Sequence, residues 1–451
     1  QKDLAVSLEG IGNVLVEQGD LPGALETYRA AQVISERLSK LDPTNVIWGH
    51  GIATSHHRIG GVLSSQGNLP GALEAYRASR SIIERLARME PSNVDLQHDL
   101  SVTLETIADI LLKQGSLASA LETYRASHDI RGGLARTALE NTNWQRALSI
   151  SHHKIGDALV QQGNLPDALE SYRGARAIVE RLARADPGNS VWQRDLSRSH
   201  TKIGDVHFYR GDLPGALEAY RDSLVIDARL SKSDPTNARL QRDVSIAHDN
   251  IGNALLEQGN LPGSLEQYRL SLGIAEIRAK GEPGNADWQR DVAVAQTKVG
   301  DVLARQDNLS GALEAYRTGI AIVERLSTLD PENVVLWSDL GTVHLKMGDV
   351  LVRQGDLSGA LVAYRTSLTL AERLAKADPS NAQRQADLAA SYGGLGQLQM
   401  RRGDQAEALR LFRTGRAIVA RISEQSGNAL WMKMMKHFDS DIVKLERGRR
   451  N

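Results

Sequence analysis

Apolar residues recur at helical spacing in two successive stretches of this chain, 142–162 and 166–185. The apolar positions of the first stretch are Trp144, Leu148, Ile155 and Leu159. Those of the second stretch are Ala168, Leu169, Tyr172, Ala175, Val179 and Leu182. Residues that are three, four or seven positions apart share one face of an α-helix, whereas a strand would alternate at every second residue. The pattern therefore predicts two amphipathic helices and excludes a strand-based repeat.

Short turns separate these helices. Gly163 precedes Pro166, and glycine accepts the left-handed conformation that ends a helix, while proline is tolerated in a first turn. Asn189 follows Pro187 and is predicted to cap the next helix, its side chain accepting a first-turn N–H. All 12 prolines of the chain fall into these two kinds of turn, so none interrupts a predicted helix.

The helix pair is repeated along the whole chain with a period of 48 residues. The marker residues of the second helices are Tyr28, Tyr76, Tyr124, Tyr172, Tyr220, Tyr268, Tyr316, Tyr364 and Phe412. A fixed period of this size indicates an array in which one supersecondary unit packs mainly on its neighbours. We therefore predict a single solenoid domain of nine repeats over 1–428. A more polar capping helix and basic tail are expected over 429–451.

A small set of positions in each unit resembles the tetratricopeptide repeat, in an extended form typical of bacterial arrays. In the fourth copy these positions are Ile155, Gly156, Leu159, Ala168, Tyr172 and Ala175, followed by a later proline. The family's unit has about 34 residues, so this unit is longer by two turns on each helix. The resemblance implies an all-α, right-handed superhelical solenoid of nine antiparallel helix pairs. It also implies that the first helices line a concave groove and that the tyrosine fills the space between repeats.

Composition removes several classes of function. The chain has no cysteine, which excludes disulfides and thiolate chemistry and is typical of a reducing, cytoplasmic compartment. No apolar run approaches the roughly 18 residues that cross a bilayer, so we expect no membrane partner. The net charge of −1 argues neither for nor against nucleic acid, which we regard as an unlikely partner. Neither an HExxH motif nor a Gly-rich phosphate loop is present. We therefore expect a protein that is not an enzyme, with no catalytic residue, cofactor or metal site.

An arginine follows the marker residue in every copy. The nine are Arg29, Arg77, Arg125, Arg173, Arg221, Arg269, Arg317, Arg365 and Arg413. They could form a ladder that binds anions, or they could pair with carboxylates of the array. Counting from the turn places Arg173 level with Asp157 and Arg181 near Asp195. Since repeated charges more often satisfy one another, we favour structural pairing.

Five first helices carry an aspartate at the same position near their end. These residues are Asp109, Asp157, Asp205, Asp301 and Asp349. The resemblance places this position in the groove, where the aspartates could bind basic peptides or pair with the arginines. Asn13 and Asn253 occupy the same position. In some relatives an asparagine there clamps a peptide's terminal carboxylate, but the accompanying basic residues are missing here, so we do not expect that clamp.

The positions three and four residues after the aspartate vary between copies and form a second candidate strip in the groove. The fifth copy has Phe208 and Tyr209, which either anchor a partner or, for Phe208, turn inward in place of leucine. The last three copies present Arg305, Arg353 and Arg401. These arginines are either a solvated row or a basic strip for an acidic ligand.

The third copy departs from the pattern at 130–133, the sequence Ile-Arg-Gly-Gly. Because two glycines inside a helix cost about 1 kcal/mol each relative to alanine, we expect this copy to be the weakest and a possible hinge.

These observations predict a scaffold that binds a protein or peptide in the concave groove. Gln1–Leu4 matches Gln193–Leu196, which lies inside a predicted helix, so we expect further protein, such as an effector or signalling module, before residue 1. The scaffold would then be the recognition or regulatory part of a larger protein. Two alternatives remain open: an array that self-associates end to end, and the regulatory region of an enzyme whose catalytic module precedes residue 1.

Overall fold

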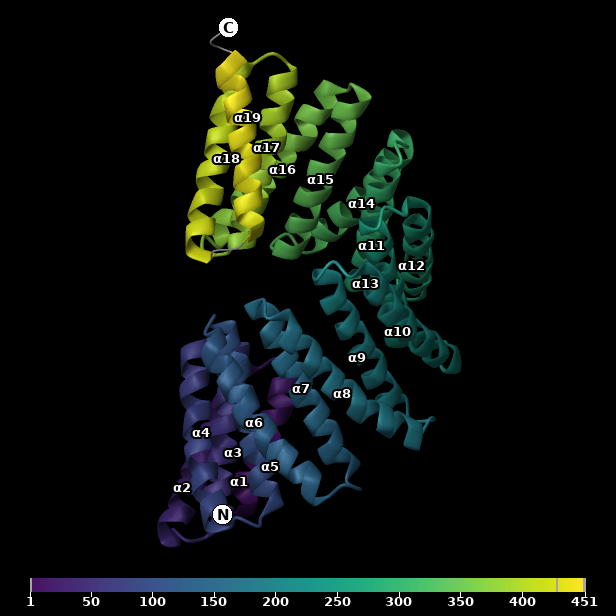
Figure 1. Cartoon of the computed structure of the whole chain (residues 1–451). Helices are drawn as coiled ribbons and strands as arrows, with labels where there is room; N and C mark the ends of the chain where they lie inside the picture. The colour runs from purple at the N-terminus through teal and green to yellow at the C-terminus, as the bar shows by residue number, and fades with distance from the viewer. Residues whose placement is uncertain (1, 427–428, 449–451) are drawn as a thin grey trace. The chain divides into compact units, whose positions relative to one another are not determined.

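The computed structural model of the chain describes residues 2–426 and 429–448, and all regular structure in these ranges is α-helical (Figure 1). The first helices of the nine pairs are α1 (Lys2–Glu17), α3 (Val46–Ser65), α5 (Val94–Lys113), α7 (Thr142–Gln162), α9 (Ser190–Tyr209), α11 (Ala238–Glu257), α13 (Ala286–Arg305), α15 (Val334–Gln354) and α17 (Ala382–Arg401). The second helices are α2 (Leu21–Leu41), α4 (Leu69–Met89), α6 (Leu117–Thr137), α8 (Leu165–Ala185), α10 (Leu213–Ser233), α12 (Leu261–Gly281), α14 (Leu309–Leu329), α16 (Leu357–Ala377) and α18 (Gln405–Ser426). A final helix, α19 (Ala429–Gly448), follows them. The described residues thus confirm the predicted all-α class, with sequential antiparallel pairs.

The chain forms two compact units, Gln1–Ile226 and Asp227–Asn451, and each is described by itself. Within a unit, a second helix packs against the first helix of its own repeat and against the first helix of the next repeat. No helix in the described ranges is both long enough and apolar enough to cross a membrane.

The predicted turn chemistry is confirmed. The asparagine side chain before a first helix accepts a backbone N–H of that helix, as Asn189 does from Trp192. The turn inside a repeat uses a glycine with positive φ, such as Gly163 at 80° and Gly355 at 90°. In the described residues one copy differs, because Asp307 takes this position with φ of 62°. A non-glycine residue in this left-handed region carries a steric cost that glycine avoids.

Replacing Asp307 with glycine should therefore raise the free energy of unfolding of the second unit by about 1 kcal/mol. The change also removes an ion pair between Asp307 and Arg353, but Asp307 is largely exposed, so this pair offsets little of the gain. Urea denaturation of the Asp307→Gly variant measures the effect, and Gly355→Asp, the reverse change one repeat later, should lower stability. A less stable Asp307→Gly variant would show that the ion pair outweighs the backbone cost.

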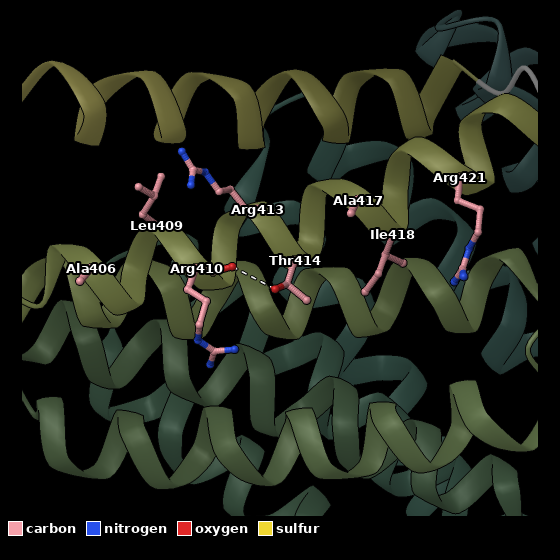
Figure 2. Close-up of a pocket in the computed structure, with 8 residues that line it drawn as sticks. All are labelled: Ala406, Leu409, Arg410, Arg413, Thr414, Ala417, Ile418 and Arg421. Atoms are coloured by element: carbon pink, nitrogen blue, oxygen red, sulfur yellow. Dashed lines mark hydrogen bonds between the residues drawn. The ribbon is translucent and has the colours of Figure 1, made fainter.

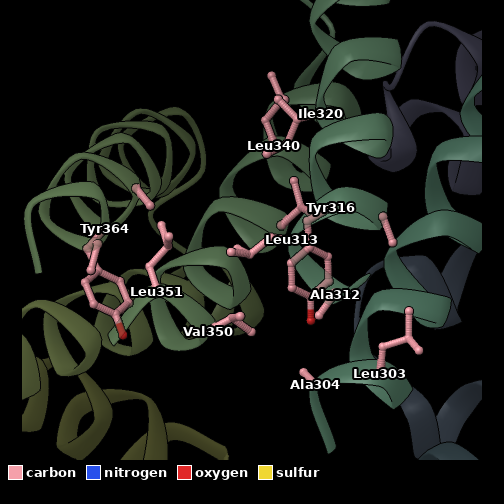
Figure 3. Packing of buried hydrophobic residues seen from close by; sticks show 14 of the residues in the cluster. Leu303, Ala304, Ala312, Leu313, Tyr316, Ile320, Leu340, Val350, Leu351 and Tyr364 are labelled. Atoms are coloured by element: carbon pink, nitrogen blue, oxygen red, sulfur yellow. The ribbon is translucent and has the colours of Figure 1, made fainter. Parts of the chain in front are cut away.

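The core between neighbouring repeats is organised by the marker tyrosines. In every copy except the third, which has Ala108, the ring lies against a glycine of its own first helix: a Cβ built on Gly300 would stand 2.5 Å from Tyr316 Cε1. Tyr316 is 2% exposed and belongs to a cluster with Leu313 of its own helix and with Val350 and Leu351 of the next first helix (Figure 3). The tyrosine therefore contacts two repeats at once, as the resemblance implied.

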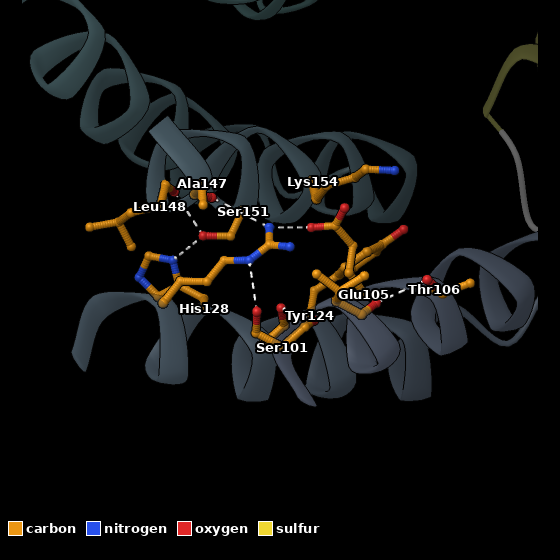
Figure 4. Close-up of polar contacts among 12 residues, drawn as sticks. Ser101, Glu105, Thr106, Tyr124, His128, Ala147, Leu148, Ser151 and Lys154 are labelled. Carbon is orange, nitrogen blue, oxygen red and sulfur yellow. Dashed lines mark hydrogen bonds and ion pairs between the residues drawn. The ribbon is translucent and has the colours of Figure 1, made fainter. Parts of the chain in front are cut away.

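The third copy contains no break in its second helix. α6 runs unbroken through Arg131 and the two glycines after it. The Arg131 side chain is 5% exposed and forms an ion pair with Glu105 of α5. It also donates to Ser101 Oγ at 3.3 Å and to the carbonyl oxygen of Ala147 in α7 at 3.3 Å (Figure 4). A buried charge network thus joins three helices where the sequence alone suggested a hinge.

The last helix closes the second unit with a shifted register. α19 begins 47 residues after α17, not 48, and buries Trp431, Phe438 and Leu445 against α18. In α16 the residue equivalent to Gly415 is Ser367, which bonds to Ser391 at 2.9 Å. In α18 a Cβ on Gly415 would stand 2.6 Å from Phe438 Cζ. The glycine therefore leaves room for the phenylalanine ring, where the equivalent Ser367 contacts a smaller serine. The helix of the predicted cap is present, while residues 449–451 of the predicted tail lie outside the described ranges.

Candidate functional site

The five aspartates of the first helices accept a hydrogen bond from the marker tyrosine of their own repeat. The donors of Asp157, Asp205, Asp301 and Asp349 are Tyr172 at 2.6 Å, Tyr220 at 2.9 Å, Tyr316 at 2.8 Å and Tyr364 at 2.6 Å, and Tyr124 donates to Asp109. Asn13 and Asn253 accept from Tyr28 and Tyr268 in the same way, at 2.8 and 2.6 Å. One polar contact at a constant position thus fixes each of these side chains.

Three of the aspartates also hold a lysine from the next repeat. Lys154 lies 2.8 Å from Asp109, Lys202 lies 2.8 Å from Asp157, and Lys346 pairs with Asp301. Each lysine follows its aspartate by 45 residues and comes from the next first helix. We refer to these three contacts as the inter-repeat ion pairs. They tie neighbouring repeats together through side chains that the sequence had placed in a ligand groove.

The charge of the lysine changes the acidity of the aspartate. Burial alone would raise the pKa of Asp157, but the charge and hydrogen bond of Lys202, with the hydroxyl of Tyr172, outweigh it and hold that pKa below its usual value. Burial raises the pKa of Tyr172, and the adjacent carboxylate raises it further. The aspartate is therefore the charged member of the contact and the tyrosine stays a neutral donor.

Asp205 and Asp349 differ from the others because the lysine is missing. The residue 45 positions later is Asn250 for Asp205 and Gly394 for Asp349. In the described residues neither aspartate has a basic side chain within ion-pairing distance. Burial raises the pKa of both carboxyl groups.

The predicted pairing of the arginines is wrong. All nine arginines after the marker residues are exposed, and in the described ranges only Arg413 has an ion pair, with Glu446 at 2.7 Å. Asp157 is held by Lys202 and not by Arg173. The partner of Asp195 is Arg146 at 2.6 Å, whereas Arg181 donates to Gln145. Since a glutamate stands three residues before the arginine in the first seven copies, the surface is of mixed charge and we assign it no anion site.

The position four residues after the aspartate is exposed in every copy, and we name these residues the variable strip. Its members are Glu17, Ser65, Lys113, Gln161 and Tyr209 in the first unit and Glu257, Arg305, Arg353 and Arg401 in the second. Tyr209 is 62% exposed, while its neighbour Phe208 is half-buried, as are Leu112, Val160 and Leu256 at the same position of other copies. The burial of Phe208 thus agrees better with the interpretation in which its ring turns inward in place of leucine. Tyr209 is the aromatic side chain that is exposed to solvent.

The three arginines of the variable strip are not equivalent. Arg353 donates to the carbonyl oxygen of Ala304 at 2.7 Å and to Asp307 at 2.9 Å, so its guanidinium is already engaged. Arg305 and Arg401 have no ion pair in the described part of the chain. The basic end of the strip thus offers two free guanidinium groups.

A shallow hollow that sequence reasoning missed runs along α18 (Figure 2). It has a volume of about 750 Å³ and is lined by Ala406, Leu409, Arg410, Arg413, Thr414, Ala417, Ile418 and Arg421. Its arginines are engaged, Arg410 with Glu407, Arg413 with Glu446 and Arg421 with Gln385. The helical spacing of small and basic residues along α18 was the only signal in the sequence. We assign no ligand to this surface.

The histidines do not gather into a metal site: in the described residues no group of three or more His, Cys, Asp or Glu side chains could hold a metal ion. His153 is buried and shares a hydrogen bond of 2.9 Å with Ser199. Burial lowers the pKa of His153 to about 4, and that of His152 to about 4 as well.

The first unit should therefore lose stability as the pH falls from about 6.5 to about 4. In this window the unfolded chain binds a proton at His153 that the folded chain does not, so the free energy of unfolding decreases, by up to about 2 kcal/mol at pH 5 relative to pH 7. Urea denaturation of the parent and of His153→Asn at both pH values isolates the contribution, because the variant should lose less on acidification. An identical pH dependence of the two would contradict it.

Comparison with solved structures places the fold among known repeat proteins. The apo form of RapI is 14% identical, with 83% of this chain and 99% of that chain covered and a TM-score of 0.50. A Signal Transduction ATPase with Numerous Domains from Pyrococcus horikoshii, which has a tetratricopeptide repeat sensor, is 13% identical. That match covers 92% of this chain and 55% of the other, with a TM-score of 0.50. No curated protein matches the sequence.

A family model for the tetratricopeptide repeat matches residues 389–414, from within α17 into α18. The segment 389–414 is thus similar to a tetratricopeptide repeat, and the described part of the chain has a tetratricopeptide-repeat-like fold. The matched segment includes the ninth marker residue, Phe412, so the same repeat extends to the other copies through the constant 48-residue period. Tetratricopeptide repeats are in general protein-binding scaffolds.

Proposed function

We propose that this tetratricopeptide-repeat chain is a non-catalytic scaffold that binds a protein or peptide partner through the variable strip. The observation that supports the proposal is the contrast between constant and variable positions. The marker tyrosine donates to the aspartate of its own repeat in all five copies that have one, whereas the exposed residue one turn beyond this position differs in charge, size and aromaticity. A rigid, preformed framework with exposed variable side chains favours recognition because little ordering is needed on binding.

The two units offer different chemistry in this strip. In the first unit the exposed ring of Tyr209 is the aromatic anchor, a residue type that is enriched where binding energy concentrates. In the second unit the free guanidinium groups of Arg305 and Arg401 suit carboxylates of a partner. We therefore propose that Tyr209 packs against one segment of the partner and that Arg305 and Arg401 bind an acidic segment of it. Neither a membrane nor a nucleic acid is part of the proposal.

Selection from a random peptide display library tests this function. Peptides enriched on the parent chain should bind at least tenfold more weakly to the double variant Arg305→Glu, Arg401→Glu. The matched control is Arg317→Glu with Arg365→Glu, which reverses two exposed, unpaired arginines outside the strip. Unchanged binding to the strip variant would move the site elsewhere. An equal loss in both variants would show a general charge effect instead of a site.

We further propose that the scaffold is the recognition or regulatory part of a larger cytoplasmic protein. The Pyrococcus horikoshii protein of similar fold combines a signal-transduction ATPase with a tetratricopeptide repeat sensor. A chain without cysteine is also compatible with a reducing compartment. An effector or signalling module, or an enzyme, would then lie in the same polypeptide. Sequencing the gene upstream of the codon for residue 1 tests this part of the proposal.

Self-association remains a second candidate function because of the exposed face of α1. Ile11 and Val14 are 52% and 50% exposed, while their equivalents in α5, Ile107 and Ile110, are 3% and 2% exposed. In the later copies this face packs against the second helix of the preceding repeat. Light scattering over a range of concentrations tests whether a second copy covers it. A mass that rises in the parent and not in Val14→Asp would favour the assembling array.

A further inference from the structure

We propose that Asp349 and Tyr364 form a seat for the ammonium group of a lysine side chain that the partner supplies. The inference rests on the proposed function and specifies one chemical feature of the partner bound at the second unit. It is argued from what the same two residue types do in the other repeats of the chain.

Three aspartates show which ligand such a pair accepts. Asp109, Asp157 and Asp301 each accept from a marker tyrosine, and each also holds the ammonium of a lysine from the next repeat. A fourth lysine, Lys298, meets an asparagine at this position and binds Asp249 instead, one turn earlier, at 2.7 Å. In each of these four cases the lysine binds a carboxylate, and it binds a different one where the usual position holds an asparagine. An aspartate with its tyrosine in place is a preorganised acceptor for a compact ammonium group.

Asp349 has the same tyrosine contact but an unused oxygen. Tyr364 donates to Asp349 Oδ1 at 2.6 Å, and no hydrogen bond to Oδ2 occurs in the described residues. Asp349 is exposed, whereas the equivalent Asp301, which is paired with Lys346, is only half-exposed. The open side of the carboxylate therefore faces solvent, from which a partner can approach.

The chain itself cannot fill the seat from the next repeat. Gly394 stands where lysine is expected, and a Cβ there would lie 2.7 Å from the Tyr364 ring and 3.0 Å from Leu345 Cδ1. A side chain at this position would require the Tyr364 ring or the helix to shift. The α17 backbone thus lies close to the tyrosine and leaves the carboxylate without a counterion.

The cations near the seat do not prevent a further ammonium from binding. Lys346, one turn before Asp349, is held by Asp301, and Arg353, one turn after it, is held by Asp307. Asp301 has arginines 4 and 52 residues after it, as Asp349 does. Because Asp301 still binds a lysine, arginines at these positions do not exclude an ammonium group. Although Asp349 is exposed on one side, the packed helices on its other side keep the pKa of its carboxyl group raised, and a bound ammonium would lower this pKa.

Carbon NMR of the aspartate side-chain carboxyl groups tests the seat with a defined probe. The probe is the capped pentapeptide Gly-Gly-Lys-Gly-Gly, and its counterpart acetylated on the lysine Nζ is the control ligand. In the parent chain the Asp349 signal should move saturably with the lysine peptide and its pKa should fall. The acetylated peptide should bind at least tenfold more weakly. An Asp349 signal that stays unmoved, or that moves equally with both peptides, overturns the proposal.

Two variants sharpen the test. Asp349→Asn should lose the saturable response. Lys346→Met should gain a saturable response of the Asp301 signal, because it removes the lysine that occupies this carboxylate one repeat earlier. A folded Lys346→Met variant without this gain would contradict the claim that the lysine contact is the template. Circular dichroism verifies that both variants fold.

The outcome can be separated from that of the proposed function. If library peptides depend on the variable strip but bind Asp349→Asn as tightly as the parent, the seat is wrong and the scaffold function stands. If no peptide is enriched while the lysine probe still binds at Asp349, the seat stands and the proposed function fails.

Discussion

Replacing Tyr316 with alanine should lower the free energy of unfolding of the second unit by about 3–5 kcal/mol. The ring is buried between Gly300 of its own repeat and aliphatic residues of the next first helix, so truncation leaves a cavity at the contact between repeats. The change also removes the hydroxyl that donates to Asp301. Urea denaturation followed by circular dichroism measures the loss.

Tyr316→Phe is the matched control for this prediction. It keeps the ring and removes only the hydroxyl, so it should cost about 1 kcal/mol. The ninth copy shows that phenylalanine is accommodated: Phe412 is 1% exposed, and the residue at the aspartate position, Gln397, bonds to Asp441 of α19 instead. A loss below 1 kcal/mol in the alanine variant would mean that the repeats do not depend on this ring.

Removing Glu105 should destabilise the first unit by about 3–5 kcal/mol, because Arg131 would keep a buried positive charge without its counterion. The guanidinium has further hydrogen bonds to Ser101 and to the carbonyl of Ala147, but these neutral acceptors do not balance its charge. Glu105→Ala is the variant to measure, by urea denaturation with hydrogen exchange of the α5–α7 amides to locate the loss.

The double variant Glu105→Ala, Arg131→Val separates charge from packing. Valine is the residue at the equivalent position of the fourth copy, where Val179 is fully buried. Since a buried ion pair can be replaced by apolar side chains at little cost, the double variant should be close to the parent in stability. If it is as unstable as Glu105→Ala alone, the loss comes from the missing glutamate side chain and not from an unpaired arginine.

The helices and their turns could be predicted from the sequence because they depend on local rules. Apolar spacing set the helical faces, and Asn189, Gly163 and the prolines set the ends, so the observed boundaries lie within a residue or two of the expected ones. The constant 48-residue period then extended the helix boundaries of one repeat to the other copies. The division into two compact units could not be predicted, because neither the apolar spacing nor the turn residues change at the boundary between residues 226 and 227.

The side-chain partners of the aspartates could not be predicted by counting depth along antiparallel helices. Depth places Arg173 level with Asp157, but adjacent residues on a helix point about 100° apart. Because Tyr172 points into the core, Arg173 must point to solvent. The correct partner was present as a second signal, a lysine that follows the aspartate by 45 residues in three copies. Recognising it required the knowledge that consecutive first helices lie side by side.

The seat at Asp349 is a case in which sequence comparison becomes informative only with the structure. Gly394 alone is one more glycine in a chain that has 40. Its meaning depends on the inter-repeat ion pairs, which show that a lysine is missing, and on Tyr364, which shows that no side chain could be placed there without movement.

The constant spacing of the inter-repeat ion pairs has a consequence for how such a chain changes length. Recombination between near-identical copies removes or adds 48 residues in phase. Loss of one repeat from the first unit would bring Lys202 to the place that Lys154 holds beside Asp109. The ion pair between neighbours would then re-form between residues that had not met before. A length change inside one of the paired helices would instead rotate the aspartate or the lysine away from its partner, by about 100° for each residue added or removed.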